Sequence, residues 1–156
     1  MSVSETELRR AVTVLDQYRA QLENLQRQQE VIALSLEELM RAKETMSRYR
    51  KAGDAAEILV PVGANAFLFG KVDDPERAII GIGSDLLVEE PIPKATERLE
   101  GRIKGLQEAA GGLAQRVAEL DARVAAQEEF VQGVYERIAE KSGEKPADAK
   151  RAKSGG

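Results

Sequence analysis

The sequence predicts an α+β fold in which a long antiparallel helical coiled-coil hairpin has two β-hairpins inserted between its helices. Three observations predict it. Leucine-rich heptads run through residues 5–52 and again through 93–141. A stretch rich in β-branched residues and interrupted by glycines separates them at 57–92. Aromatic residues make up only 4% of the 156 residues, which is too few for a thick globular core.

The first heptad segment predicts an N-terminal coiled-coil helix over residues 5–52. Its a and d positions include Leu8, Leu15 and Leu22, and ten of twelve are apolar across six heptads. That exceeds the three or four heptads that indicate a coiled coil. Ser4 has capping-box spacing with the glutamate three residues later, so the helix is expected to begin there. Gly53 is expected to end it in a left-handed conformation.

The middle segment changes to short apolar runs separated by turn residues, which is typical of β-hairpins. The turn residues are Gly63–Asn65 in the first hairpin and Ser84–Asp85 in the second. The two hairpins together span residues 57–92. The four expected strands are 57–62, 66–72, 78–83 and 86–89.

The second heptad segment predicts a C-terminal coiled-coil helix over residues 93–141, with Pro93 in its first turn. Because the two helices are nearly equal in length, each can cover the other's apolar seam only by folding back antiparallel. Leu8 is then expected near residues 133–138, and Leu36 near Leu106. The remaining residues, 142–156, are expected to form a disordered basic tail.

Composition excludes most catalytic chemistry. Cysteine and histidine are both absent, which removes disulfides, thiol nucleophiles, imidazole bases and the commonest zinc ligands. Gly81-Ile82-Gly83 lacks the third glycine of a dinucleotide fingerprint, and Gly70-Lys71 is not followed by the hydroxyl of a phosphate loop. We therefore expect no enzyme, no catalytic residue, no cofactor and no metal.

Charge and hydropathy point to a cytoplasmic protein that binds neither nucleic acid nor membrane. The net charge is −4 with both signs interspersed, which argues against a phosphate-binding groove. No run of 18 apolar residues occurs, and the polar start does not look like a signal peptide.

The strands are apolar on both faces, yet 57–92 is too short to hold a core by itself. Oligomerisation with other chains at the strand edges is the favoured interpretation. A small sheet lying back on its own coiled coil is the alternative. The residues expected at the subunit contacts are Ile58, Val60, Phe67, Phe69, Ile80, Ile82, Leu86 and Val88.

Near the chain ends, apolar residues spread beyond the a and d positions. Val12 and Tyr135 occupy e, while Val14 and Phe130 occupy g. A wide apolar stripe with charged borders favours binding of another protein's apolar segment, although ordinary shoulder packing would give the same pattern. The candidate binding residues at these tips are Val3, Val12, Val14, Phe130, Val131, Val134, Tyr135 and Ile138.

The order helix, two hairpins, helix resembles the α-class prefoldin subunits of archaea. The resemblance also rests on Ile58-Leu-Val-Pro-Val-Gly63, on Gly81-Ile-Gly83 and on Leu87-Val-Glu89. The glycine-rich second helix and the long tail depart from it.

The resemblance implies an ATP-independent chaperone subunit within a hetero-hexamer of two α-type and four β-type subunits. It also implies that coiled-coil tips bind non-native polypeptides and deliver them to a group II chaperonin. A structural coiled-coil adaptor for a fixed partner is the alternative function.

Overall fold

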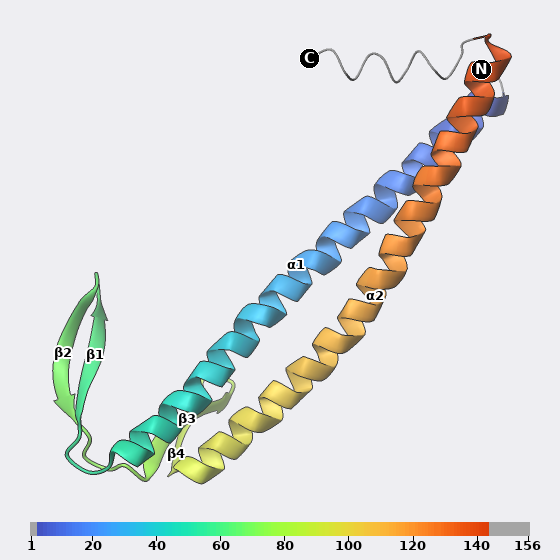
Figure 1. Ribbon diagram of the computed structural model, residues 1–156. Coiled ribbons are helices and arrows are strands. Elements are labelled where there is room, and N and C mark those ends of the chain that lie inside the picture. The colour runs from blue at the N-terminus through green and yellow to red at the C-terminus, as the bar shows by residue number, and fades with distance from the viewer. Residues whose placement is uncertain (1–2, 144–156) are drawn as a thin grey trace. The chain divides into compact units, whose positions relative to one another are not determined.

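The computed structural model describes residues 3–143. In chain order, two antiparallel β-hairpins lie between two long helices (Figure 1). Most of the predicted tail lies outside the described residues. The elements, in chain order, are α1 (Val3–Ala52), β1 (Glu57–Gly63), β2 (Ala66–Lys71), β3 (Arg77–Gly83), β4 (Leu86–Pro91) and α2 (Ile92–Lys141).

Helix α1 follows its heptads and is reinforced along its outer surface by ion pairs one turn apart. Arg27 pairs with Glu23 at 3.0 Å, and two similar pairs follow further along the helix. The helix begins at Val3, so Ser4 lies inside it rather than at the expected cap. It ends at Ala52 because Gly53 adopts a φ of 80°, as predicted.

The chain divides into two compact units. The first, here called the terminal unit, is described over residues 3–30 and 111–143, and the second, the hairpin unit, spans Val31–Ala110. Within each unit, portions of α1 and α2 run antiparallel and share an apolar seam. The residues of α1 and α2 with less than a tenth of their surface exposed are Ala11, Leu15, Leu113, Leu120 and Val134 in the terminal unit, and Ile92, Ala95 and Leu99 in the hairpin unit.

Ion pairs across the seam fix the helix register that the sequence predicted. In the terminal unit, Arg137 lies 3.6 Å from Glu7. In the hairpin unit, Lys43 lies 3.1 Å from Glu100. Residues near the start of α1 therefore face the end of α2, and residues late in α1 face its beginning, which confirms the antiparallel hairpin.

The two β-hairpins have matching local geometry. Each closes through a two-residue turn, Ala64–Asn65 or Ser84–Asp85, in which both residues have φ between 50° and 58°. This left-handed pair suits the right-handed twist of the strands. Each hairpin also shifts register just before a glycine with positive φ, Gly63 or Gly83.

One face of the β3–β4 hairpin packs on the coiled coil of its own chain. Ile80 forms a buried cluster with Ala95 and Leu99, and Val88 packs against that cluster. The alternative considered from the sequence, a sheet lying back on its own helices, therefore describes this face. Ile80 and Val88, both expected at subunit contacts, are covered within the chain.

A buried charge ties the same hairpin to α2. Glu90 is 5% exposed and accepts a hydrogen bond of 2.7 Å from Nε of Arg98. Lys94 adds a second, longer ion pair at 3.9 Å. Because a buried carboxylate is stable only when paired, these two cations hold the strand against the helix.

Candidate interaction surfaces

The described residues carry no constellation suited to chemistry. Among residues 3–143, no group of three or more Asp, Glu, His or Cys side chains is placed to hold a metal ion. Glu90 is the one buried charged side chain among the described residues, and its pairing with Arg98 gives it a structural role. Neither helix contains a stretch apolar enough to cross a bilayer, over the residues described. The surfaces that need explanation are apolar ones.

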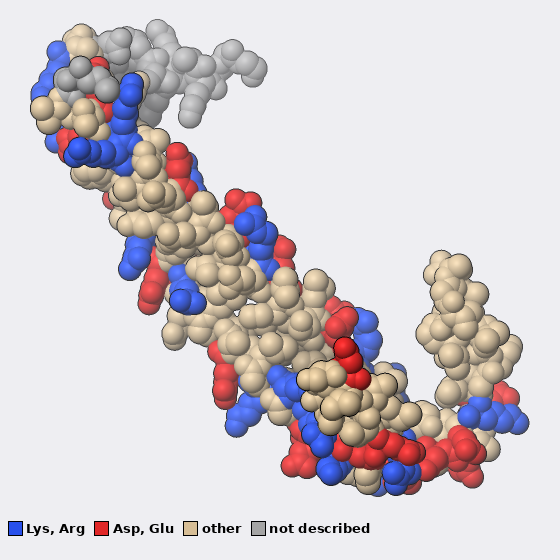
Figure 2. Space-filling view, turned by 180° about the vertical axis from the view of Figure 1, so that it is seen from behind, with Lys and Arg blue, Asp and Glu red and all other residues tan. Residues whose placement is uncertain are grey.

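The β1–β2 hairpin exposes apolar side chains on both faces. One face carries the pairs Leu59 with Phe69 and Pro61 with Phe67, and we call Leu59, Phe67 and Phe69 its aromatic face. Phe69 is 87% exposed. Figure 2 shows this hairpin almost free of charge except at its base, whereas charges are interspersed along the helices. A two-stranded hairpin is marginal alone in water, so this one requires a cover.

The outer face of β3–β4 presents a second apolar surface. Ile79 and Leu87 lie on the face opposite Ile80, and both are exposed. Arg77 pairs with Glu89 at 3.3 Å on the same face. The side chain of Arg102 donates to the carbonyl oxygen of Gly81, which anchors β3 to α2. One face of this hairpin is therefore closed by the chain itself and the other is open.

The structure separates the predicted assembly residues into two sets. Ile80 and Val88 are covered by the helices, and Ile58 is half-buried. The prediction omitted five exposed apolar residues on the same strands, although they lie beside the chosen ones in the sequence. The predicted residues that are exposed are Val60, Phe67, Phe69, Ile82 and Leu86, and the omitted ones are Leu59, Val62, Leu68, Ile79 and Leu87.

A groove of about 770 Å³ runs along one side of the helix pair in the terminal unit. Val14 and Phe130, at g positions of facing heptads, provide its apolar walls, and Phe130 is 46% exposed. At its floor, Nε2 of Gln127 donates a hydrogen bond of 2.9 Å to the carbonyl oxygen of Ala11. We call this the terminal groove. Its lining is Val3, Thr6, Glu7, Arg10, Ala11, Val14, Gln127 and Phe130.

The other predicted tip residues do not all lie on a free surface. Val12 and Tyr135 are at e positions, away from the terminal groove, and Tyr135 is 50% exposed. Val134 is only 1% exposed and belongs to the seam. Val131 and Ile138 are partly buried. The sequence could have separated these three, because its own heptads place them at a and d.

Comparison with known proteins gives a consistent result. A family model described as Prefoldin subunit matches residues 18–137. Prefoldin subunit alpha of Pyrococcus horikoshii is 33% identical over 125 residues, which is 80% of this chain and 84% of that protein. Prefoldin subunit alpha of Methanothrix thermoacetophila is 29% identical over 104 residues, covering 67% and 68% of the two chains.

A solved structure supports the fold. A chain from the cryo-EM structure of filamentous PFD from Methanocaldococcus jannaschii matches with a TM-score of 0.64 and 25% identity, covering 73% of this chain and 94% of that one.

The fold defines a class of coiled-coil proteins that assemble with other subunits. Two β-hairpins are inserted between the helices of an antiparallel coiled coil, and apolar faces of these hairpins are left open. The family match extends over most of the chain. The chain belongs to the prefoldin subunit family, and the resemblance to archaeal α-class subunits is confirmed. It is a subunit of a chaperone complex that assembles with other prefoldin subunits.

Proposed function

We propose that this subunit holds non-native polypeptides at its terminal unit without ATP, and passes them to a group II chaperonin. The proposed setting is a cytoplasmic complex of two α-type and four β-type subunits. The observation that carries the proposal is the terminal groove, where Val14 and the half-exposed Phe130 offer apolar surface beyond what the seam uses. Exposed apolar surface of this kind is suited to unfolded chains.

The hairpins support the assembled state in this proposal. The aromatic face of β1–β2 and the outer face of β3–β4 are apolar and uncovered within the chain. Contact with hairpins of neighbouring subunits would remove both from water and complete the strand edges. The terminal unit, which contains neither hairpin, is left free for clients.

A structural adaptor for one fixed partner remains the alternative function. Such a protein would present a continuous apolar stripe matched to one sequence. The terminal groove instead mixes Val14 and Phe130 with Thr6, Glu7 and Arg10. The lining therefore lacks a continuous apolar stripe matched to one sequence, and for this reason we favour client holding.

The test replaces the two half-exposed aromatic side chains of the terminal unit together. Phe130→Ser with Tyr135→Ser removes side chains that are 46% and 50% exposed in their parent residues. Each costs about 1 kcal/mol of stability, half the value for a fully buried side chain. Suppression of aggregation of a denatured client by the assembled complex should fall sharply, while the thermal melt changes little.

A seam substitution provides the control. Leu120 is 6% exposed, so Leu120→Ser should cost about 3 kcal/mol of unfolding free energy. It should therefore lower the melting temperature more than the aromatic double variant does. If the aromatic double variant melts early and still protects the client, its side chains belong to the core and the proposal is wrong. The transfer step is tested by capturing the client on the complex without nucleotide and then measuring its passage to a purified group II chaperonin.

A further inference from the structure

A second groove lies in the terminal unit, and its lining is polar and basic rather than apolar. It measures about 440 Å³ and is floored by the seam leucines Leu25 and Leu120. We call it the arginine groove. Its remaining lining is Gln21, Asn24, Gln28, Arg116, Glu119 and Arg123.

The heptads place the arginine groove on the same side of the helix pair as the terminal groove. Val14 in α1 is followed at intervals of seven residues by Gln21 and Gln28. In α2, Arg116 and Arg123 precede Phe130 at the same interval. Residues seven apart share one side of a coiled-coil helix, so the two grooves follow one another along that side.

The two arginines of this groove are free to bind a partner. Neither Arg116 nor Arg123 has an ion-pair partner within residues 3–143. Glu119 is the one acidic residue in the lining, which leaves the groove with a net positive charge. A planar guanidinium with unused donors is suited to a carboxylate.

On the opposite side of the terminal unit, the arginine beside the seam is paired, unlike Arg116 and Arg123. There the seam is bordered by Val12 and Tyr135 and by the ion pair of Arg19 with Glu128, at 2.9 Å. The cation on that side is therefore neutralised across the seam. An apolar section followed by unpaired arginines occurs on the terminal-groove side.

We propose that this side of the terminal unit binds extended client segments in which an apolar residue is followed or preceded by acidic residues. This inference rests on the proposed client-holding function and names the substrate class. The apolar side chain occupies the terminal groove beside Phe130, and carboxylates reach Arg123 and Arg116. Along α2 the two arginines lie about 10 and 21 Å from Phe130. An extended chain covers those distances in about three and six residues.

The experiment measures binding of fluorescein-labelled peptides to the full 156-residue chain by fluorescence anisotropy. Three peptides share a Phe-Leu anchor, and the residues three and six positions away are both Gln, both Glu or both Lys. Two exposed ion pairs are expected to favour the Glu peptide over the Gln peptide about fivefold. The preference should disappear at about 1 M salt. A fourth peptide, with the Glu pair but no anchor, should bind more weakly than the anchored ones.

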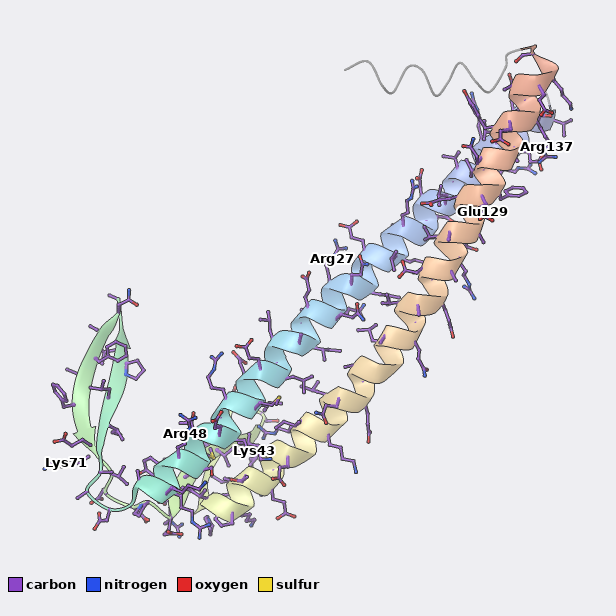
Figure 3. All side chains as sticks on the ribbon, in the orientation of Figure 1. Arg27, Lys43, Arg48, Lys71, Glu129 and Arg137 are labelled. Atoms are coloured by element: carbon purple, nitrogen blue, oxygen red, sulfur yellow. The ribbon has the colours of Figure 1, made fainter. Side chains whose placement is uncertain are left out.

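The variant Arg116→Gln with Arg123→Gln should bind the Glu and Gln peptides equally and keep the parent's affinity for the Gln peptide. The control, Arg9→Gln with Arg27→Gln, makes the same charge change outside the grooves. Arg27 extends from the side of α1 turned away from α2 (Figure 3) and pairs with Glu23. This control should retain the fivefold preference.

Three results would overturn the inference while leaving client holding intact: equal affinity of the parent chain for the Gln and Glu peptides, equal loss of preference in the control, or equal binding of the peptide without an anchor. If no anchored peptide binds, while the aromatic double variant also protects a client as well as the parent does, client holding at the terminal unit fails as well.

Discussion

Replacing Phe69 by serine tests whether the β1–β2 hairpin is an assembly surface. Phe69 is 87% exposed on the aromatic face, so in the single chain the change removes almost no packing. Burial of a phenylalanine removes about 150 Å² or more from water, worth about 3 to 4 kcal/mol at roughly 25 cal/mol per Å². If a neighbouring subunit covers this side chain, Phe69→Ser should weaken assembly by a factor of about 100 to 1,000.

The assay is mass photometry of the co-expressed complex over a dilution series, with helicity followed by circular dichroism. We expect the variant complex to dissociate at concentrations where the parent remains assembled, with helicity unchanged. Phe130→Ser is the matched control, since it makes the same change in the terminal unit, and it should leave the assembly intact. An unchanged dissociation midpoint for Phe69→Ser would refute the argument that this hairpin is covered by another subunit.

Three further predictions follow from the hairpin unit and from the absence of a phosphate loop in the sequence. Ile82→Lys places a charge on a partly exposed strand position and should break the assembly while sparing the helices. Ile80→Lys should also lower the melting temperature, because Ile80 packs on Ala95 and Leu99. Equal melting temperatures for the two variants would contradict this packing. Arg98→Ala leaves the carboxylate of Glu90 with only the more distant Lys94 and should cost about 2–3 kcal/mol of unfolding free energy, measured by chemical denaturation. The double variant Arg98→Ala with Glu90→Gln should recover part of that loss. An unchanged unfolding free energy in the single variant would disprove the structural role of the pair. Client capture by the assembled complex should be the same with and without ATP, and a rise on adding ATP alone would refute the binding-only mechanism.

The sequence predicted the parts of the fold that local patterns determine. Heptads identified both helices because a coiled-coil seam repeats every seven residues. Gly53, Asn65 and Asp85 were visible as residues suited to positive φ, whereas Ala64 and Ser84 adopt it without such a preference. The antiparallel register followed from the need of each helix to cover the other's seam, and the Glu7–Arg137 pair agrees with it.

The sequence could not predict which apolar and charged residues become buried, because burial depends on tertiary packing. Ile80 and Phe69 look alike as apolar strand residues, but one packs on α2 and the other is exposed, because only β3–β4 lies against the helices on one face. Glu90 likewise has the residue type of a surface charge, but it is buried and paired with Arg98. The arginine groove requires both helices together, since Gln21 and Arg123 come from opposite ends of the chain.

In the proposed complex, clients contact the terminal unit while the hairpins are occupied by neighbouring subunits. A photo-crosslinking amino acid placed at position 130 or at position 69 of the co-expressed complex tests it most directly, with a denatured client added after assembly. We expect client adducts from position 130 and adducts to other prefoldin subunits from position 69. Client adducts from position 69 with none from position 130 would contradict it.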